Sequence, residues 1–211
     1  MLHLDEAEMN TIVNPVTLID RSFYFIIGFS FVFLFAITLV MIGFVIRYRR
    51  SKHPTPSDIR GNLLLETVWI VLPAFIAGSM FISGWKSYTG LRTVPEGALE
   101  IEVIGQSFSW LFYYPNDKET ENEIVVPVNT PVKLNITSED VIHSFFIPAF
   151  RVKVDAVKGI MTYAWFLPEK EGEYFFQCTE FCGSGHSDMT GVVRVVSQKA
   201  YDEWISQDDE W

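Results

Sequence analysis

The sequence predicts a membrane-anchored all-β protein: a two-helix transmembrane hairpin, then a β-sandwich or barrel domain with a short C-terminal helix. Three observations predict this arrangement. Long apolar stretches occur only in the first 85 residues, many short β-rich runs follow them, and a cluster of metal-binding side chains lies near the last runs. The predicted parts are residues 1–22, 23–85 and 86–211.

Two apolar stretches, residues 23–46 and 63–85, are long enough to cross a bilayer as helices, which takes about 20 apolar residues. The first carries no charge, and the second carries only Glu66. A buried core helix is the alternative, but such helices rarely run this far without a polar face. The first stretch also lacks the basic leader and cleavage site of a signal peptide. We therefore expect a permanent transmembrane hairpin.

The loop that joins the two stretches, residues 47–62, is basic and contains a single acid, Asp58. Because basic loops stay on the inner side of a membrane, we expect this loop in the cytoplasm or an organelle matrix. Residues 1–22 then form an external tail, and residues 86–211 form an external domain. The chain has a formal net charge of −10. This charge repels nucleic acid and attracts basic partners, although solubility alone is a simpler explanation of it.

The external domain reads as a series of short strands separated by turn formers. Such spacing is typical of a sandwich or barrel. Its last segment begins at Ser197, a plausible N-cap, and predicts a short closing helix. The predicted strands cover residues 99–105, 107–114, 123–128, 132–137, 141–147, 162–167, 173–178 and 191–196.

Both cysteines of the chain lie in one segment, CTEFCGSGHSDM, residues 178–189. One explanation is a helix, because residues 178, 182, 186 and 189 would share a face, but the glycines at 183 and 185 oppose it. A second explanation is a disulfide in the oxidising space outside the membrane. A disulfide would leave the histidine and the methionine of this segment unexplained.

A metal site explains all four side chains. Thiolate, imidazole and thioether groups favour copper over magnesium or calcium, and a methionine ligand is unusual for zinc. The other histidine of the site would be His143, because His3 lies in the tail and His53 in the inner loop. A packed core histidine is the alternative at position 143. Two thiolates can bridge two copper ions, each with one histidine, whereas a mononuclear blue-copper site uses a single cysteine.

The segment resembles the C-x-E-x-C-x3-H-x2-M signature of the CuA domain in subunit II of haem–copper cytochrome c oxidases. The resemblance extends from the helical hairpin to residue 196 and implies a cupredoxin-like β-sandwich with a dinuclear copper centre. It implies bridging by Cys178 and Cys182. The other implied ligands are His143 and Met189 on one copper, and His186 and the backbone carbonyl of Glu180 on the other.

The resemblance gives roles to further acidic residues. The Glu180 carboxylate would help to hold magnesium at the junction with subunit I, although an incidental loop acid is the simpler explanation. Glu66 would open a proton path into subunit I, although a carboxylate at this depth can equally reach the membrane surface. Asp155 would make structural hydrogen bonds or ion pairs near subunit I. Glu139 and Asp140 match acids that dock cytochrome c.

The stretch GQSFSWLFYYP, residues 105–115, resembles the aromatic segment where electrons enter this family of proteins. Trp110 matches one tryptophan of the family, but Phe108 stands where another tryptophan is common. An aromatic stripe is more often core packing. The departure at Phe108 raises the alternative of a donor other than a soluble cytochrome c.

We therefore expect a subunit that accepts electrons from a c-type cytochrome and passes them to haem in subunit I, where oxygen is reduced to water and protons are translocated. The implied partners are subunit I, other oxidase subunits, the c-type cytochrome and the lipid bilayer, without nucleic acid. We expect no independent catalysis. The implied location is a bacterial cytoplasmic membrane, or a mitochondrial inner membrane, with the C-terminal domain on the periplasmic or outer side.

Other functions fit parts of the same sequence. A nitric oxide reductase with a CuA subunit would have the same centre, and a membrane-anchored copper carrier would have an exchangeable site. A disulfide-bonded scaffold would hold no copper. A quinol oxidase subunit is disfavoured because such relatives lose the copper ligands, and nitrous oxide reductase is disfavoured because its copper domain lacks this membrane hairpin.

Overall fold

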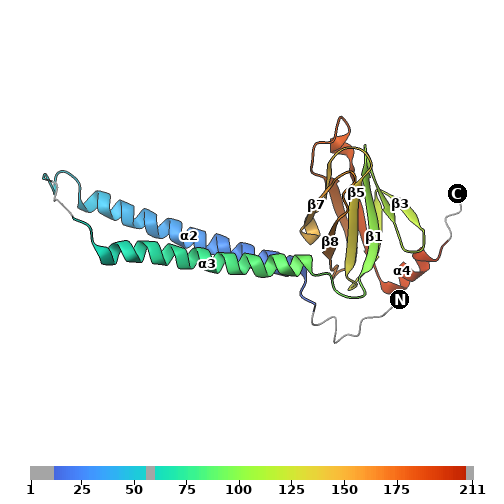
Figure 1. Cartoon of the computed structure of the whole chain (residues 1–211), viewed down its shortest axis with the longest axis horizontal. Helices are drawn as coiled ribbons and strands as arrows, with labels where there is room; N and C mark the ends of the chain where they lie inside the picture. Colours follow the sequence, from blue (N-terminus) through green and yellow to red (C-terminus); the bar gives the residue numbers. More distant parts are fainter. Residues whose placement is uncertain (1–11, 56–59, 208–211) are drawn as a thin grey trace. The chain divides into compact units, whose positions relative to one another are not determined.

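A computed structural model describes residues 12–55 and 60–207 of the chain (Figure 1). The chain divides into two compact units: Ile19–Ser87, and Met1–Leu18 together with Tyr88–Trp211. Most of the predicted external tail, with His3, and the inner-loop acid Asp58 lie outside the described residues.

Within the described residues, two helices are long and apolar enough to cross a membrane: α2 (Pro15–Arg47) and α3 (Leu63–Arg92). They run side by side as a hairpin (Figure 1). Both helices are longer than the apolar stretches. The backbone hydrogen bonds of a helix can continue past the last residue that faces lipid. The early start of α2 follows from Asn14, whose side chain accepts from the Val16 amide at 2.9 Å. Proline at the first helical position suits this cap.

Serine hydroxyls join the two helices near one end of the hairpin. Ser22 Oγ lies 3.0 Å from Ser83 Oγ and 2.8 Å from Ser87 Oγ. Small polar residues let helix backbones approach closely in lipid, where apolar surface alone gives no driving force for association. At the other end, Asn62 caps α3 by accepting from the Leu65 amide at 3.1 Å.

The other unit is a sandwich of two five-stranded sheets, as the sequence predicted (Figure 1). The strand orders are β3-β2-β1-β5-β8 and β4-β10-β9-β6-β7, and the pairs β1–β5 and β4–β10 are parallel. The strands are β1 (Leu99–Gln106), β2 (Ser109–Tyr113), β3 (Glu119–Glu121), β4 (Glu123–Pro127), β5 (Val132–Ser138), β6 (His143–Ile147), β7 (Val152–Ala156), β8 (Thr162–Phe166), β9 (Gly172–Cys178) and β10 (Thr190–Val196).

Two strands were not predicted, and both lie at sheet edges. β3 falls in the polar stretch that we interpreted as a turn, and β7 has the short alternating sequence VKVDA. Charged, short strands are common at edges, where only one side of the backbone pairs. Such strands carry a weak apolar signal, so sequence patterns detect them poorly.

An aromatic core fills the space between the sheets. Phe112, Phe145 and Phe176 are fully buried, and their rings contact one another at centroid distances of 4.9–6.0 Å. β1 and β5 bury alternate residues, which is the pattern expected when one face of a sheet meets a second sheet. This packing holds fixed the strand ends that carry the site described below.

The predicted closing helix is present as α4 (Gln198–Ile205), with Ser197 Oγ accepting from the Ala200 amide at 3.3 Å. The turn between β2 and β3 binds the last carbonyl of the helix and a second carbonyl two residues beyond it. Asn116 Nδ2 donates to the Ile205 carbonyl and Lys118 Nζ to the Gln207 carbonyl, each at 2.9 Å. Terminal helix carbonyls need such partners because they have none within the helix.

Replacing Lys118 with methionine should loosen α4. The variant keeps an unbranched apolar side chain but removes the ammonium group, which sits 4.9 Å from the centre of the Trp204 ring and binds the Gln207 carbonyl. Because a hydrogen bond to a charged group contributes about 1.5–3 kcal/mol, the α4 amides should exchange hydrogen faster by a factor of roughly ten or more. Lys199→Met is the control, because Lys199 is 87% exposed and pairs only loosely with Glu203, at 3.7 Å. Equal exchange in the two variants would contradict the proposed anchoring.

Candidate metal centre

Two segments that are distant in sequence meet at one end of the sandwich: the start of β6, and the end of β9 with the loop that follows it. Phe145 in β6 pairs with Cys178 at the end of β9, so the start of β6 lies beside the last residue of β9. Because side chains alternate along a strand, His143 shares a face with Phe145 and points to the same side as the cysteine. The Thr179 amide donates to the Ser144 carbonyl at 2.9 Å and continues this pairing into the loop.

The loop between β9 and β10 supplies the remaining side chains. His186 begins a short 3-10 turn, η2 (His186–Asp188), and Met189 follows it directly before β10. Cys182 lies in the irregular part of the loop. The segment is therefore not the continuous helix considered from the spacing alone, and its ligands reach one another because the loop folds back over the end of β9.

The six predicted donors lie close together. Cys178 Sγ lies 3.9 Å from His143 Nδ1 and 3.3 Å from the Glu180 carbonyl oxygen. Cys182 Sγ lies 3.6 Å from His186 Nδ1 and 3.8 Å from Met189 Sδ. The two sulfur atoms are 4.0 Å apart, and both cysteines are free thiols. A disulfide bond would need about 2.05 Å, so the disulfide explanation does not describe this structure.

The chemistry of this set fits soft metal ions. One nitrogen or sulfur atom from each of His143, Cys178 and Cys182 lies within 4.8 Å of the others. His143 and Met189 are fully buried and Cys178 almost so, whereas Cys182 and His186 are partly exposed. Two thiols, two imidazoles and a thioether suit copper, and the buried surroundings exclude the water that hard cations retain.

Asp140 orients the buried histidine. Its Oδ1 lies 2.7 Å from His143 Nε2, and its Oδ2 accepts from the Ser107 amide at 2.9 Å. A carboxylate only accepts hydrogen bonds, so Nε2 carries the proton and Nδ1 keeps a lone pair that faces Cys178. Partial burial raises the pKa of Asp140, but the hydrogen bonds from Ser107, His143 and the Val141 amide outweigh it and hold the pKa below its usual value.

Burial and the neighbouring Cys178 raise the pKa of Cys182 from 9.0 to about 11. Without metal, this thiol is therefore protonated at neutral pH. Since the thiolate is the form that binds metal, uptake of an ion must release the proton.

The two aromatic residues singled out from the sequence differ in exposure. Trp110 is fully buried, and its ring lies edge-on to His143 with centroids 5.8 Å apart. Its Nε1 has no hydrogen-bond partner within the part of the chain that the structure describes. Gly105 lets both rings approach β1, because a Cβ there would lie 3.0 Å from Trp110 and 3.2 Å from His143. Phe108 is 38% exposed at the turn between β1 and β2.

The remaining predicted residues lie as follows. Asp155 accepts from Ser144 Oγ at 2.7 Å, which is a structural hydrogen bond of the expected kind. The side chains of Glu139 and Glu180 are exposed. Glu66 lies in the first turn of α3, in the other unit.

Sequence reasoning missed residues that line the rim of the site. Phe181 is 78% exposed between Glu180 and Cys182, and its ring lies 5.8 Å from that of His186. Val141 and Ile142 are also exposed beside His143. The available signal was an apolar residue directly before each of two ligands, Ile142 before His143 and Phe181 before Cys182.

Two family models match the chain. Residues 114–196 match the one described as cytochrome c oxidase subunit II, periplasmic domain, and residues 6–83 match the one described as cytochrome c oxidase subunit II, transmembrane domain. Together the matches include α2, the larger part of α3 and every cysteine and histidine donor described above.

Individual proteins give the same result. A probable cytochrome c oxidase subunit 2 of Rickettsia prowazekii (strain Madrid E) is 33% identical over 189 residues, which cover 79% of this chain and 60% of the relative. Cytochrome c oxidase subunit 2 of Cereibacter sphaeroides is 30% identical over 223 residues, covering 85% of this chain and 74% of the relative. The chain thus spans 60% of the length of the Rickettsia relative and 74% of the length of the Cereibacter relative.

The fold has a counterpart among solved structures. The crystal structure of the periplasmic domain of subunit II of cytochrome oxidase (CoxB) of Bradyrhizobium japonicum superimposes with a TM-score of 0.52 and 35% identity. The match covers 54% of this chain and 94% of that domain. It supports the cupredoxin-like sandwich expected from the sequence.

Asp140→Ala should weaken copper binding by about 10- to 100-fold, because loss of a group that orients a ligating histidine typically has this effect. The measurement is a competition titration of the purified chain with a copper chelator. Glu139→Ala is the matched control, because Glu139 is the adjacent acid and is exposed. Equal copper affinity in the two variants would show that the contact of Asp140 with His143 has no orienting role.

Copper uptake should depend steeply on pH. The raised pKa of Cys182 means that binding removes a proton at pH 6–9, so affinity should rise about tenfold per pH unit for each proton released. The metal-free protein should show the opposite trend. A raised folded-state pKa stabilises the fold below pH 9.0, and this contribution is lost as the pH rises towards about 11. Copper affinity that does not change between pH 6 and 9 would contradict this assignment.

Proposed function

This chain belongs to the cytochrome c oxidase subunit II family, and on that basis we propose that it is the electron-accepting subunit of a respiratory terminal oxidase. The dinuclear copper centre CuA, when bound, supplies a one-electron relay between a c-type cytochrome outside the membrane and haem in subunit I. Reduction of oxygen to water and translocation of protons belong to subunit I, and this chain carries out no catalysis alone.

The observation that carries this proposal is that each thiol has its own imidazole. His143 Nδ1 lies 3.9 Å from Cys178 Sγ, His186 Nδ1 lies 3.6 Å from Cys182 Sγ, and the two sulfur atoms are 4.0 Å apart. A mononuclear site needs only one thiolate, whereas this paired arrangement provides for two ions. Met189 would be a further donor to the ion held by His143, and the Glu180 carbonyl would be a further donor to the ion held by His186.

Rigid surroundings also suit electron transfer. Cys178 and His143 sit on paired strands of the core, and Asp140 fixes the ring of His143. Ligands that cannot move change little in position when the charge at the site changes, so little energy is needed for reorganisation. A copper carrier would instead need ligands that open and release the metal.

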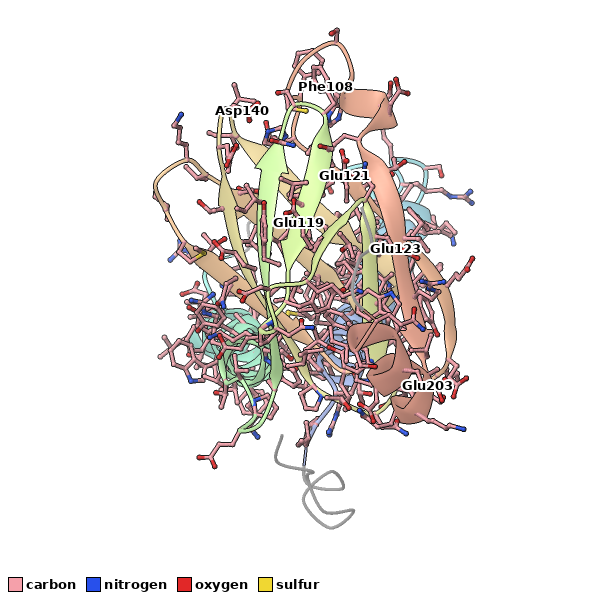
Figure 2. All side chains as sticks on the ribbon, turned by 90° about the vertical axis from the view of Figure 1, so that its right-hand side faces the viewer. Phe108, Glu119, Glu121, Glu123, Asp140 and Glu203 are labelled. Carbon is pink, nitrogen blue, oxygen red and sulfur yellow. The ribbon has the colours of Figure 1, made fainter. Side chains whose placement is uncertain are left out.

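The surface around the site suits a basic electron donor. Figure 2 shows Asp140 and Phe108 at the same end of the domain, with Glu119, Glu121 and Glu123 along the adjoining side. These acids, together with Glu139, would steer a positively charged cytochrome and increase its association rate, an effect that salt weakens. In this proposal electrons enter near Phe108 and pass by Trp110, which touches His143.

Two acids have proposed roles beyond the copper site. The exposed Glu180 carboxylate would be available to magnesium at the contact with subunit I, while its carbonyl faces Cys178. Glu66, in the first turn of α3, would begin a proton path from the inner side. The membrane would be a bacterial cytoplasmic or mitochondrial inner membrane, with the copper domain on the outer side.

Copper analysis and electron paramagnetic resonance of the chain in its purified complex would test the proposal. We expect two copper ions per chain, hyperfine coupling shared equally by two nuclei, and slow loss of copper to chelators. Cys178→Ser and Cys182→Ser should each abolish the shared coupling. One copper per chain with coupling to a single nucleus would contradict the dinuclear centre, and rapid loss of copper would favour the carrier.

A further inference from the structure

Phe108 lies against the backbone of the loop that carries half of the metal ligands. A Cβ built at Gly183 would lie 2.9 Å from ring atoms Cε1 and Cζ of Phe108. A Cβ built at Gly185 would lie 2.6 Å from ring atoms Cγ and Cδ2. Both distances are shorter than real Cβ contacts, so the ring occupies the space that side chains at these two positions would need.

The two glycines are required for different reasons. Gly183 has φ +143°, a conformation that side chains rarely adopt, so its own backbone explains the glycine. Gly185 has φ −93° and ψ 11°, a conformation open to other residues. At Gly185 it is therefore the Phe108 ring that excludes a side chain, and the two residues form a matched pair.

The turn that carries Phe108 also contacts the other half of the site. The amide of Ser107, the preceding residue, donates to Asp140 Oδ2 at 2.9 Å, and Asp140 Oδ1 lies 2.7 Å from His143 Nε2. The turn between β1 and β2 thus contacts both halves of the site. It reaches His143 through the carboxylate of Asp140, and it reaches the segment before His186 through the ring of Phe108. Figure 2 shows Phe108 and Asp140 together at this end of the domain.

Among the described residues, the middle of the loop has few other restraints. The two ends of the loop are tied to the strands, because the Thr179 amide donates to the Ser144 carbonyl at 2.9 Å and the Met189 carbonyl accepts from the Cys178 amide at 3.0 Å. Between these ends the backbone hydrogen bonds stay within the loop, such as the His186 amide to the Gly183 carbonyl at 3.2 Å and the Asp188 amide to the Gly185 carbonyl at 3.0 Å. By contrast, His143 and Cys178 are held by paired strands. The half of the site that contains Cys182 and His186 therefore depends more on packing against the outside of the loop.

We propose that Phe108 is a positioning residue for the copper site: its ring holds the Gly183–Gly185 backbone so that His186 stays beside Cys182. This inference takes the identity of the metal from the proposed function. The contact of Phe108 with the two glycines is independent of that function. It differs from a role in receiving electrons, because it predicts effects on the loop and on copper retention in the absence of any donor protein.

A double-mutant cycle on the chain in its complex tests the proposal, with Phe108→Ala, Gly185→Ala and the double variant. Phe108→Ala should release copper to a chelator about tenfold faster and broaden the hyperfine pattern. Gly185→Ala should do the same, because its methyl group meets the ring. The double variant should be less perturbed than the sum of the two single changes, because the methyl group then fills the vacated space.

Three further measurements complete the design. Phe108→Tyr, which keeps the ring, should retain the copper of the unmodified chain. Phe175→Ala, which removes an exposed phenylalanine of β9 that is not part of the site, should leave the release rate unchanged. In the metal-free chain, Phe108→Ala should speed hydrogen exchange at the amides of His186 and Asp188, a readout that needs no copper.

Two results would overturn the inference. One is that Phe108→Ala slows reduction by a cytochrome but leaves chelator release, hyperfine coupling and loop exchange unchanged, since this would leave Phe108 with a role in electron entry only. The other is strict additivity in the cycle. Failure of the proposed function would look different, because the unmodified chain itself would then bind a single copper.

Discussion

The pairing of β6 with β9 is the constraint on which the metal site depends. It sets Phe145 opposite Cys178, and the alternation of side chains along β6 then directs His143 towards the thiol. A shift of this register by one residue would turn His143 to the other face of the sheet. The aromatic core prevents such a shift, because Phe145 packs against Phe112 and Phe176 between the sheets.

The two halves of the site are held by different physical means. The half with His143 and Cys178 is fixed by strand pairing, burial and the carboxylate of Asp140. The half with Cys182 and His186 sits on the middle of a loop, where the backbone hydrogen bonds are local and the residues are partly exposed. A site of this kind gains rigidity in its loop half from whatever packs against the loop. Phe108 is the aromatic side chain in that position, and the absence of a side chain at Gly185 makes its approach possible.

The same turn between β1 and β2 therefore combines two requirements. Its partly exposed ring suits contact with an electron donor, and its contacts with the loop and Asp140 suit the maintenance of ligand geometry. These requirements need not favour the same side chain, because the first concerns the surface and the second concerns the fit against two glycines. This gives a physical context for a phenylalanine at position 108.

The sequence by itself determined the class of the protein. Uninterrupted apolar stretches indicated the two long helices, and alternating runs indicated eight of the ten strands that the structure describes. The donor types between residues 178 and 189 indicated a soft metal site. The start of α2 was also encoded locally, in Asn14 and Pro15, although the apolar pattern alone did not indicate it. These features share a cause: they depend on residues close together in the chain.

Only the tertiary structure decided which of these residues act together. Asp140 was an acid expected to dock a donor, and the structure brings it to His143 and to the amide of Ser107. Gly185 was evidence against a helix, and the structure gives a different reason for it in the ring of Phe108. β3 and β7 were missed because edge strands take much of their definition from their neighbours. In each case the deciding contact joins segments separated in sequence, and no local pattern records which surfaces meet when two sheets pack.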